Sequence, residues 1–260
     1  MRVATLLAAA LPILAQSPAP VPHRSGEEIL ARVDRLRHPW PVFTVELTVK
    51  DPKTSQRWKV SARDNGDARL DGLSDKEKGR AVLVRGDQMW LLLPGSRRPL
   101  KVTPQQRLMG PAAGGDVART RFREDYSVQA MADDTLEGRS CWRLELAAKR
   151  PALSARQVAL WVAKEGSLPL KAEFRLASGR LARTARFGAP VQAQGQPVLS
   201  RMDLEEAGGQ RIEISFGAWS KGGVDPSAFE LPNPGPNPGP NPGPNPGPNS
   251  GPRQGPDSGR

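Results

Sequence analysis

Residues 79–110 read GRAVLVRGDQMWLLLPGSRRPLKVTPQQRLMG, and this stretch decides how the rest of the chain is interpreted. Two turn sequences, Arg85–Gln88 and Pro94–Ser96, interrupt it. The segments between and around the turns are apolar and rich in strand-forming residues: Ala81–Val84, Met89–Leu93 and Leu100–Val102. The stretch therefore predicts one β-hairpin followed directly by another.

The same strand pattern recurs outward from this stretch in both directions. Phe43, Val45 and Leu47 alternate with polar residues, and segments around positions 58, 144, 174 and 214 repeat this period of two. Such alternation gives a strand one dry face and one wet face, as in an antiparallel sheet. We expect about eleven to thirteen strands, joined mostly by hairpins.

Two segments suit helices instead of strands. Ser25 and Glu28 form a capping-box pattern ahead of an apolar stripe that ends before Pro39. Later, Asp116 is placed to cap a helix that continues through Arg123. A plain surface connection is the alternative for this second segment, because it is poorly apolar and follows flexible glycines.

The double hairpin resembles the periplasmic lipoprotein-carrier family (LolA/LolB-like, outer membrane lipoprotein sorting). In that family, a strand pair ending in Trp and a Pro-containing turn precede a basic strand and a Met-Gly pair. The matching residues here are Trp90, Pro94, Arg97, Arg98, Met109 and Gly110. Four later segments resemble successive family strands: Gly138–Ala148, Ala159–Phe174, Gly179–Phe187 and Val224–Leu231. The small residues of Pro111–Gly115 depart from the acidic, aromatic segment common in the family.

The predicted fold class is mainly β (α+β). A sheet of about eleven strands with one apolar face must curl or split to hide that face. Two architectures satisfy this requirement: a two-sheet sandwich, or an incomplete, half-open barrel with a short helical lid. The family resemblance favours the half-open barrel.

The ends of the chain differ from its middle. Arg2 and the apolar run up to Leu14 predict a signal peptide, residues 1–15, cleaved near Ala15. A Pro-rich lead-in, 16–24, precedes the folded domain, 25–231. The tail, 232–260, repeats Asn-Pro-Gly-Pro and has no apolar residue to bury, so we expect it to stay disordered. We expect an exported periplasmic protein without a lipid anchor, because no Cys follows Ala15.

Composition argues against several function classes. The formal net charge of +11 is spread along the strands and is not gathered with aromatic residues, so we expect no nucleic-acid partner. We expect Cys141, the single cysteine, to be a small buried apolar residue and not a reactive thiol. His23 and His38 have no companions at a recognisable spacing. We therefore predict no catalytic residues, no metal, no cofactor and no enzyme activity.

The resemblance implies a carrier that binds the acyl chains of lipoproteins, or a related lipid, and moves them toward the outer membrane. Its partners would be an inner-membrane export complex and an outer-membrane acceptor, and we expect a monomer. The alternative is an envelope sensor of the same fold that recognises a protein or peptide. An arginine on an early strand is linked to lid closure in the family, but Arg63 shares the parity of exposed residues and is not assigned that role.

Inward positions of the strands define the expected lipid site. An acyl chain offers no hydrogen bonds, so its cavity needs an apolar lining. The expected lining is Val45, Leu47, Val49, Trp58, Val60, Leu144, Leu146, Phe174, Leu176, Ile212, Ile214 and Phe216. The expected lid or gate contains Asp116, Ala118 and Phe122.

Overall fold

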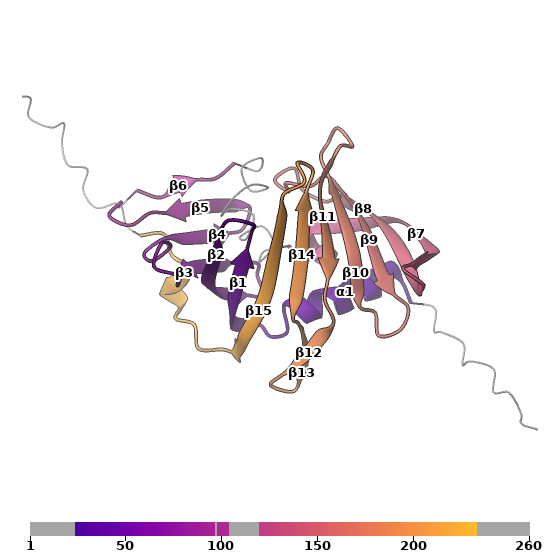
Figure 1. Cartoon of the computed structure of the whole chain (residues 1–260), viewed down its shortest axis with the longest axis horizontal. Coiled ribbons are helices and arrows are strands. Elements are labelled where there is room, and N and C mark those ends of the chain that lie inside the picture. The colour runs from indigo at the N-terminus through magenta and orange to yellow at the C-terminus, as the bar shows by residue number, and fades with distance from the viewer. Residues whose placement is uncertain (1–23, 97, 104–119, 233–260) are drawn as a thin grey trace, which may run out of the picture.

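The computed structural model describes residues 24–96, 98–103 and 120–232, and Figure 1 shows their path. The predicted signal peptide, the repeat tail from residue 233 on, Arg97 and the Met-Gly pair lie outside the described residues. The elements in chain order are α1 (Gly26–Arg37), β1 (Val42–Lys50), β2 (Ser55–Arg63), β3 (Ala68–Gly72), β4 (Ala81–Arg85), β5 (Gln88–Leu92), β6 (Leu100–Lys101), α3 (Phe122–Asp125), β7 (Tyr126–Leu136), β8 (Arg139–Ala148), β9 (Gln157–Ala163), β10 (Pro169–Arg175), β11 (Leu181–Phe187), β12 (Pro190–Ala193), β13 (Gln196–Leu199), β14 (Arg201–Glu206), β15 (Arg211–Lys221) and the 3-10 turn η2 (Pro226–Phe229).

The strand pattern of the sequence produces one 13-stranded antiparallel sheet. Its strand order is β6-β5-β4-β3-β2-β1-β15-β14-β11-β10-β9-β8-β7, and β12 and β13 form a separate two-stranded sheet. The edges of the large sheet, β6 and β7, do not pair with each other. The half-open barrel is therefore confirmed, and the sandwich alternative is wrong.

The double hairpin predicted within residues 79–110 forms β4, β5 and β6. Ala81 pairs with Leu92 and Trp90 pairs with Lys101, so both predicted turns reverse the chain. Gly86 in the first turn has φ of 51°, a left-handed conformation that glycine adopts without a steric penalty. This hairpin pair builds one end of the sheet.

The centre of the sheet joins the two ends of the domain. β1 pairs with β2 on one side and with β15 on the other, where Phe43 lies opposite Lys221 and Lys50 opposite Glu213. A bulge between Val45 and Leu47 interrupts this β1–β15 register. Bulges bend a strand and increase local twist, which suits a sheet that must curl.

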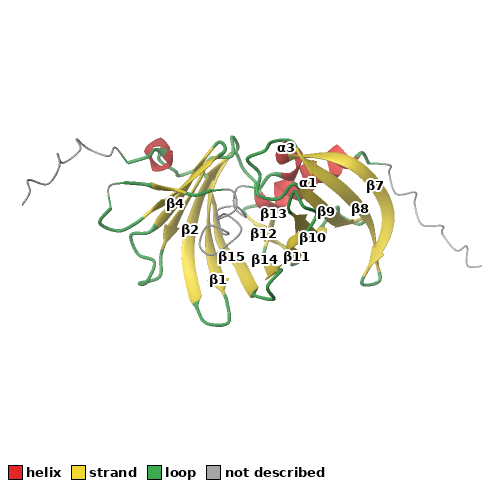
Figure 2. Ribbon diagram, turned by 90° about the horizontal axis from the view of Figure 1, so that it is seen from above, coloured by secondary structure: helices red, strands yellow, loops and turns green. Residues whose placement is uncertain are grey.

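Helix α1 lies in the hollow of the curled sheet, beside β7 to β11 in Figure 2. Its capping box is complete: the Ser25 N–H donates to the Glu28 carboxylate, and the Glu28 N–H donates to the Ser25 hydroxyl. The apolar stripe of the helix, Ile29, Leu30 and Val33, is fully buried. The helix therefore covers apolar sheet surface that would otherwise face water.

The outer face of the sheet carries the polar half of the alternation. Arg201, for example, pairs with Asp203 on its own strand and with Glu213 on the neighbouring strand β15. Near β3 the turn η2 covers part of this face, where Arg69 donates to the Ala228 carbonyl and the Arg63 guanidinium lies 4.1 Å from the centre of the Phe229 ring. Arg63 therefore acts as an outer-face contact in this structure.

Candidate functional site: a cleft at the mouth of the half-barrel

The structure buries most of the predicted lining residues in one apolar core. Four of them, Val45, Leu47, Val60 and Phe216, surround a void together with Arg37, Phe43 and Trp219. Trp58, Leu144, Leu146, Phe174 and Ile214 are buried elsewhere in the same core, and Val49 and Ile212 pack against it. Leu176 lies apart from this group, in a second cleft.

The void between α1 and the strands is small. Its volume is about 20 Å³, close to the space that one water molecule needs and well below the roughly 150 Å³ of a cavity that admits benzene. The inward face of the sheet is thus a packed core in this conformation. An acyl chain would enter it only if neighbouring elements moved apart.

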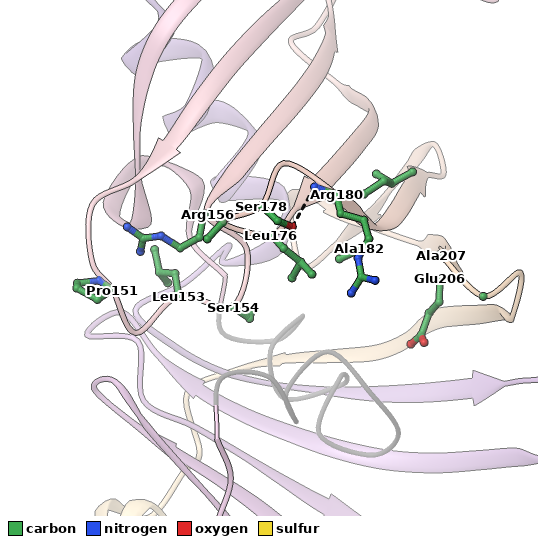
Figure 3. A pocket seen from close by; sticks show the side chains of 13 residues that line it. Pro151, Leu153, Ser154, Arg156, Leu176, Ser178, Arg180, Ala182, Glu206 and Ala207 are labelled. Carbon is green, nitrogen blue, oxygen red and sulfur yellow. Dashed lines mark hydrogen bonds between the residues drawn. The ribbon is translucent and has the colours of Figure 1, made fainter.

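A much larger cleft, of about 760 Å³, opens where β9, β10, β11 and β14 end. Figure 3 shows its lining side chains projecting from the β8–β9 and β10–β11 connections. We call it the mouth cleft. The described residues that line it are Pro151, Leu153, Ser154, Arg156, Leu176, Ala177, Ser178, Arg180, Leu181, Ala182, Glu206, Ala207 and Gly208.

The mouth cleft combines an apolar floor with charged walls. Leu153 belongs to the main core, so the cleft adjoins the buried face of the sheet. Arg156 is half-buried and donates through Nη1 to the Arg150 carbonyl at 2.6 Å. Arg180 is exposed, and Glu206 is half-buried on the opposite side. Such a lining can accept an amphiphile, with an apolar part toward Leu153 and a polar part toward water.

Arg150 bridges distant parts of the sheet beside this cleft. One side of its guanidinium contacts the Asp87 carboxylate in the β4–β5 turn, and the other contacts Asp125 at the end of α3. Asp125 is almost fully buried and also accepts a hydrogen bond from the Arg121 backbone N–H. The Arg150 bridge therefore holds the β4–β5 end of the curled sheet against its β8–β9 end.

Helix α3 is fixed to α1 by a buried carboxylate. Asp34 accepts hydrogen bonds from the backbone N–H groups of Phe122 at 2.8 Å and Arg123 at 2.9 Å. Burial raises the Asp34 pKa to about 6, although these hydrogen bonds and the Arg37 and Arg121 charges oppose the shift. The carboxylate supplies the acceptor that the first N–H groups of a helix lack.

This tether alters the prediction made for the second helix. In the described residues α3 begins at Phe122, Arg121 precedes it in an extended conformation, and Asp34 caps it from another element. Of the predicted gate residues, Asp116 and Ala118 lie outside the described ranges. Phe122 is completely buried, with its ring stacked 6.4 Å from that of Phe174.

His38 lies beside this tether, at the end of α1. Its Nε2 is 3.4 Å from the Thr120 carbonyl, while its buried Nδ1 has no partner among the described residues. Burial, reinforced by the nearby charges of Arg37 and Arg121, lowers the His38 pKa to about 3. The imidazole is thus kept neutral, with Nε2–H as the donor.

Sequence reasoning did not identify Arg183, which is buried on the apolar side of β11. Arg183 lies opposite Phe174 in the register, and its guanidinium is 5.0 Å from the centre of the Phe174 ring. The available signal was parity, because Arg183 lies two residues from Ala185 and so shares its face of the strand, and Ala185 is fully buried in the main core. A buried cation thus lies against the Phe174 ring.

The remaining candidate groups have structural partners. Asp134 accepts a hydrogen bond from the Trp161 indole at 2.8 Å, and Asp133 pairs with Lys164. Cys141 is fully buried, and burial together with the Asp134 charge raises the pKa of its thiol. In the described residues no group of three or more His, Cys, Asp or Glu is arranged to hold a metal ion. Within the same ranges, no helix is long and apolar enough to cross a bilayer.

An unclosed antiparallel sheet, a helix in its apolar hollow and a cleft at its mouth define a half-barrel protein. A family model described as an uncharacterized protein matches residues 73–220. No curated protein matches the chain. The chain belongs to the family of this model, and its fold is LolA-like.

Three solved structures share this fold. A LolA superfamily protein from Nitrosomonas europaea is 26% identical, with a TM-score of 0.70 over 80% of this chain and 98% of its own. A domain provisionally assigned as an outer membrane lipoprotein-sorting protein, from Vibrio parahaemolyticus, is 19% identical, with a TM-score of 0.64 over 78% and 95% of the two chains. A DUF1329 family protein from Desulfovibrio piger is 17% identical, with a TM-score of 0.64 over 79% and 95%.

Proposed function

We propose that this protein is a periplasmic carrier that binds the acyl chains of a lipoprotein, or of a related lipid, and transfers them toward the outer membrane. The observation that carries the proposal is the mouth cleft, whose apolar floor at Leu153 adjoins the core on the inner face of an unclosed sheet. The similarity to a LolA superfamily protein supports the same role.

Loading would require the two halves of the curled sheet to separate. The inner void is about 20 Å³, because the expected lining positions other than Leu176 are packed in or against one core. Eight to ten buried methylenes contribute roughly 6–8 kcal/mol before the costs of association and opening. This balance suits a carrier, because the ligand is held firmly enough to travel and weakly enough to be released.

The test begins with the protein purified from its own envelope. Native mass spectrometry should show a bound lipid or lipoprotein, and the emptied protein should take up the neutral fluorophore N-phenyl-1-naphthylamine. The absence of both would leave the carrier proposal without support. Leu47→Glu and Phe174→Glu should reduce uptake by placing a charge at a buried position, provided that thermal unfolding shows each variant to be folded.

A second candidate function, recognition of an extended peptide, is favoured by strand β7. This strand of 11 residues is an edge of the sheet, and Met131 on it is 41% exposed. An exposed edge offers backbone groups to which another strand can add. Co-purification of a protein partner without lipid would favour this function over the carrier.

A further inference from the structure

We propose that the mouth cleft selects amphiphiles with an anionic oxyanion head, a carboxylate or a phosphate, and that Arg180 and Arg156 are the residues that receive it. The inference rests on the proposed function, since it assigns the head of the same ligand whose chain enters the half-barrel. It concerns a property that the apolar core cannot provide, namely discrimination between ligands with identical chains.

The Arg180 guanidinium is available for a ligand. Arg180 lies at the end of the β10–β11 connection. Its hydrogen bonds to other described residues involve only its backbone: its N–H donates to the Ser178 hydroxyl at 3.4 Å, and its carbonyl accepts from the Leu176 N–H. In the part of the chain that the structure describes, its side chain makes no ion pair or hydrogen bond. This differs from Arg175 at the end of β10, which pairs with Glu173 at 2.7 Å.

Arg156 supplies a second cation on the same cleft. It is half-buried, and among the described residues the one hydrogen bond of its guanidinium runs from Nη1 to the Arg150 carbonyl. A carbonyl does not neutralise a guanidinium, so the positive charge of Arg156 still acts on the cleft. Two guanidinium groups offer paired N–H donors whose geometry matches the oxygens of a carboxylate or phosphate.

The order of groups across the cleft matches the order of groups in an amphiphile. Leu153 lies on the core side and Arg180 on the solvent side. A ligand whose chain passes Leu153 and Leu176 toward the core would therefore leave its head beside the cations. Glu206, on the facing wall, is the one carboxylate among the described lining residues, and it should oppose an anionic head.

The experiment measures displacement of N-phenyl-1-naphthylamine from the full chain by pairs of ligands with matched chains. Dodecanoate is compared with dodecanol, and dioctanoyl phosphatidylglycerol with dioctanoyl phosphatidylcholine. The first pair tests a carboxylate head and the second a phosphate-linked anionic head, so the two sources are separated. We expect the anionic member of at least one pair to bind about fivefold more tightly than its partner, which is the upper range for one exposed ion pair.

Two variants in the cleft should act in opposite directions. Arg180→Gln should remove most of the preference for the anionic ligand, and Glu206→Gln should increase it. Arg139→Gln is the matched control, because Arg139 is an exposed residue at the start of β8, away from the cleft, and its loss changes the net charge equally. The preference should also weaken as salt increases, since exposed charges are screened.

The outcomes separate this inference from the proposed function. If the alcohol and the acid bind equally, and phosphatidylcholine equals phosphatidylglycerol, the head-group inference is overturned while the carrier remains. If Arg139→Gln lowers the preference as much as Arg180→Gln, general charge is responsible and the assigned site is wrong. If no ligand and no fluorophore binds, both proposals fall together.

Discussion

Asp87 in the β4–β5 turn and Arg150 in the β8–β9 connection form an ion pair between distant positions of one sheet. The two connections lead into or out of β4 and β9. In the order of the sheet, seven strands lie between β4 and β9: β3, β2, β1, β15, β14, β11 and β10. The pair exists because the sheet curls until its two halves face each other. The same guanidinium also pairs with Asp125, so Arg150 joins two carboxylates.

Replacing Arg150 by Gln should destabilise the domain by about 1–2 kcal/mol. Asp125 would remain buried without its cation, and the partial exposure of Arg150 keeps the loss below that of a fully buried pair. Urea unfolding measures the effect. Arg143→Gln, which breaks an exposed pair with Glu145, is the control and should change stability little. Equal effects in both variants would contradict a special role for the Arg150 bridge.

The buried carboxyl of Asp34 should make stability fall as the pH rises from about 4 to 6. Its folded pKa, about 6, is raised above the ordinary value of 3.8, so the folded state holds the proton more tightly in that window. Ionisation then costs roughly 3 kcal/mol relative to the unfolded chain. Asp34→Asn removes this titration, so the stability of wild type relative to the variant should decline across the window. A constant difference would refute the assignment.

His38 should produce the opposite slope. Its folded pKa of about 3 lies below the ordinary 6.5, so its contribution is complete above pH 6.5 and is lost as the pH falls toward 3. Protonation would add an Nδ1–H with no acceptor, close to Arg37 and Arg121. His38→Gln keeps a donor for the Thr120 carbonyl and removes the titration. Its stability should depend less on acid than that of wild type, measured by unfolding at pH 7 and pH 4.

The two opposing slopes have a joint signature. Wild type should vary little between pH 4 and 6, because loss of stability at Asp34 on raising the pH is offset by the gain at His38. Each single variant should then reveal the slope of the group that remains. If both variants keep the pH profile of wild type, the slopes of Asp34 and His38 do not offset each other, and this prediction is wrong.

Gly72 should tolerate no side chain. A Cβ at this position would lie 2.2 Å from the Glu77 carbonyl oxygen, and that backbone cannot rotate away as a flexible side chain can. Gly72→Ala should therefore cost about 2–3 kcal/mol or prevent folding. Gly208→Ala is the control, because its Cβ would meet nothing within 4 Å. A thermal midpoint unchanged in Gly72→Ala would show that the 73–80 loop adapts.

The sequence predicted the sheet well because its main signal is local. Parity along a strand assigns a face to every residue, so Val45, Leu144 and Ile214 were correctly expected to point inward. The capping box of α1 depends on residues only three apart, so the start of this helix was equally predictable. The double hairpin was predictable because its two turns contain the residues that such turns require.

The site was less predictable because it depends on contacts between distant segments. Asp34 caps α3 from a helix far away in the sequence, and no local pattern indicates this. The mouth cleft is assembled from connections, where residues follow no period, so only Leu176 was anticipated in its lining. Whether the core positions such as Leu47 also receive a ligand stays a prediction.

The pairing of β1 with β15 has a consequence for how the chain folds. These strands lie at the centre of the sheet, yet they come from the first and the last parts of the domain. The two halves of the sheet cannot be joined until residue 221 is available, so their inner edges stay open until then. Folding should consequently be slow for a domain of this size, because long loops must close before the central ladder forms. A holding chaperone that shields β1 and β14 should raise the refolding yield.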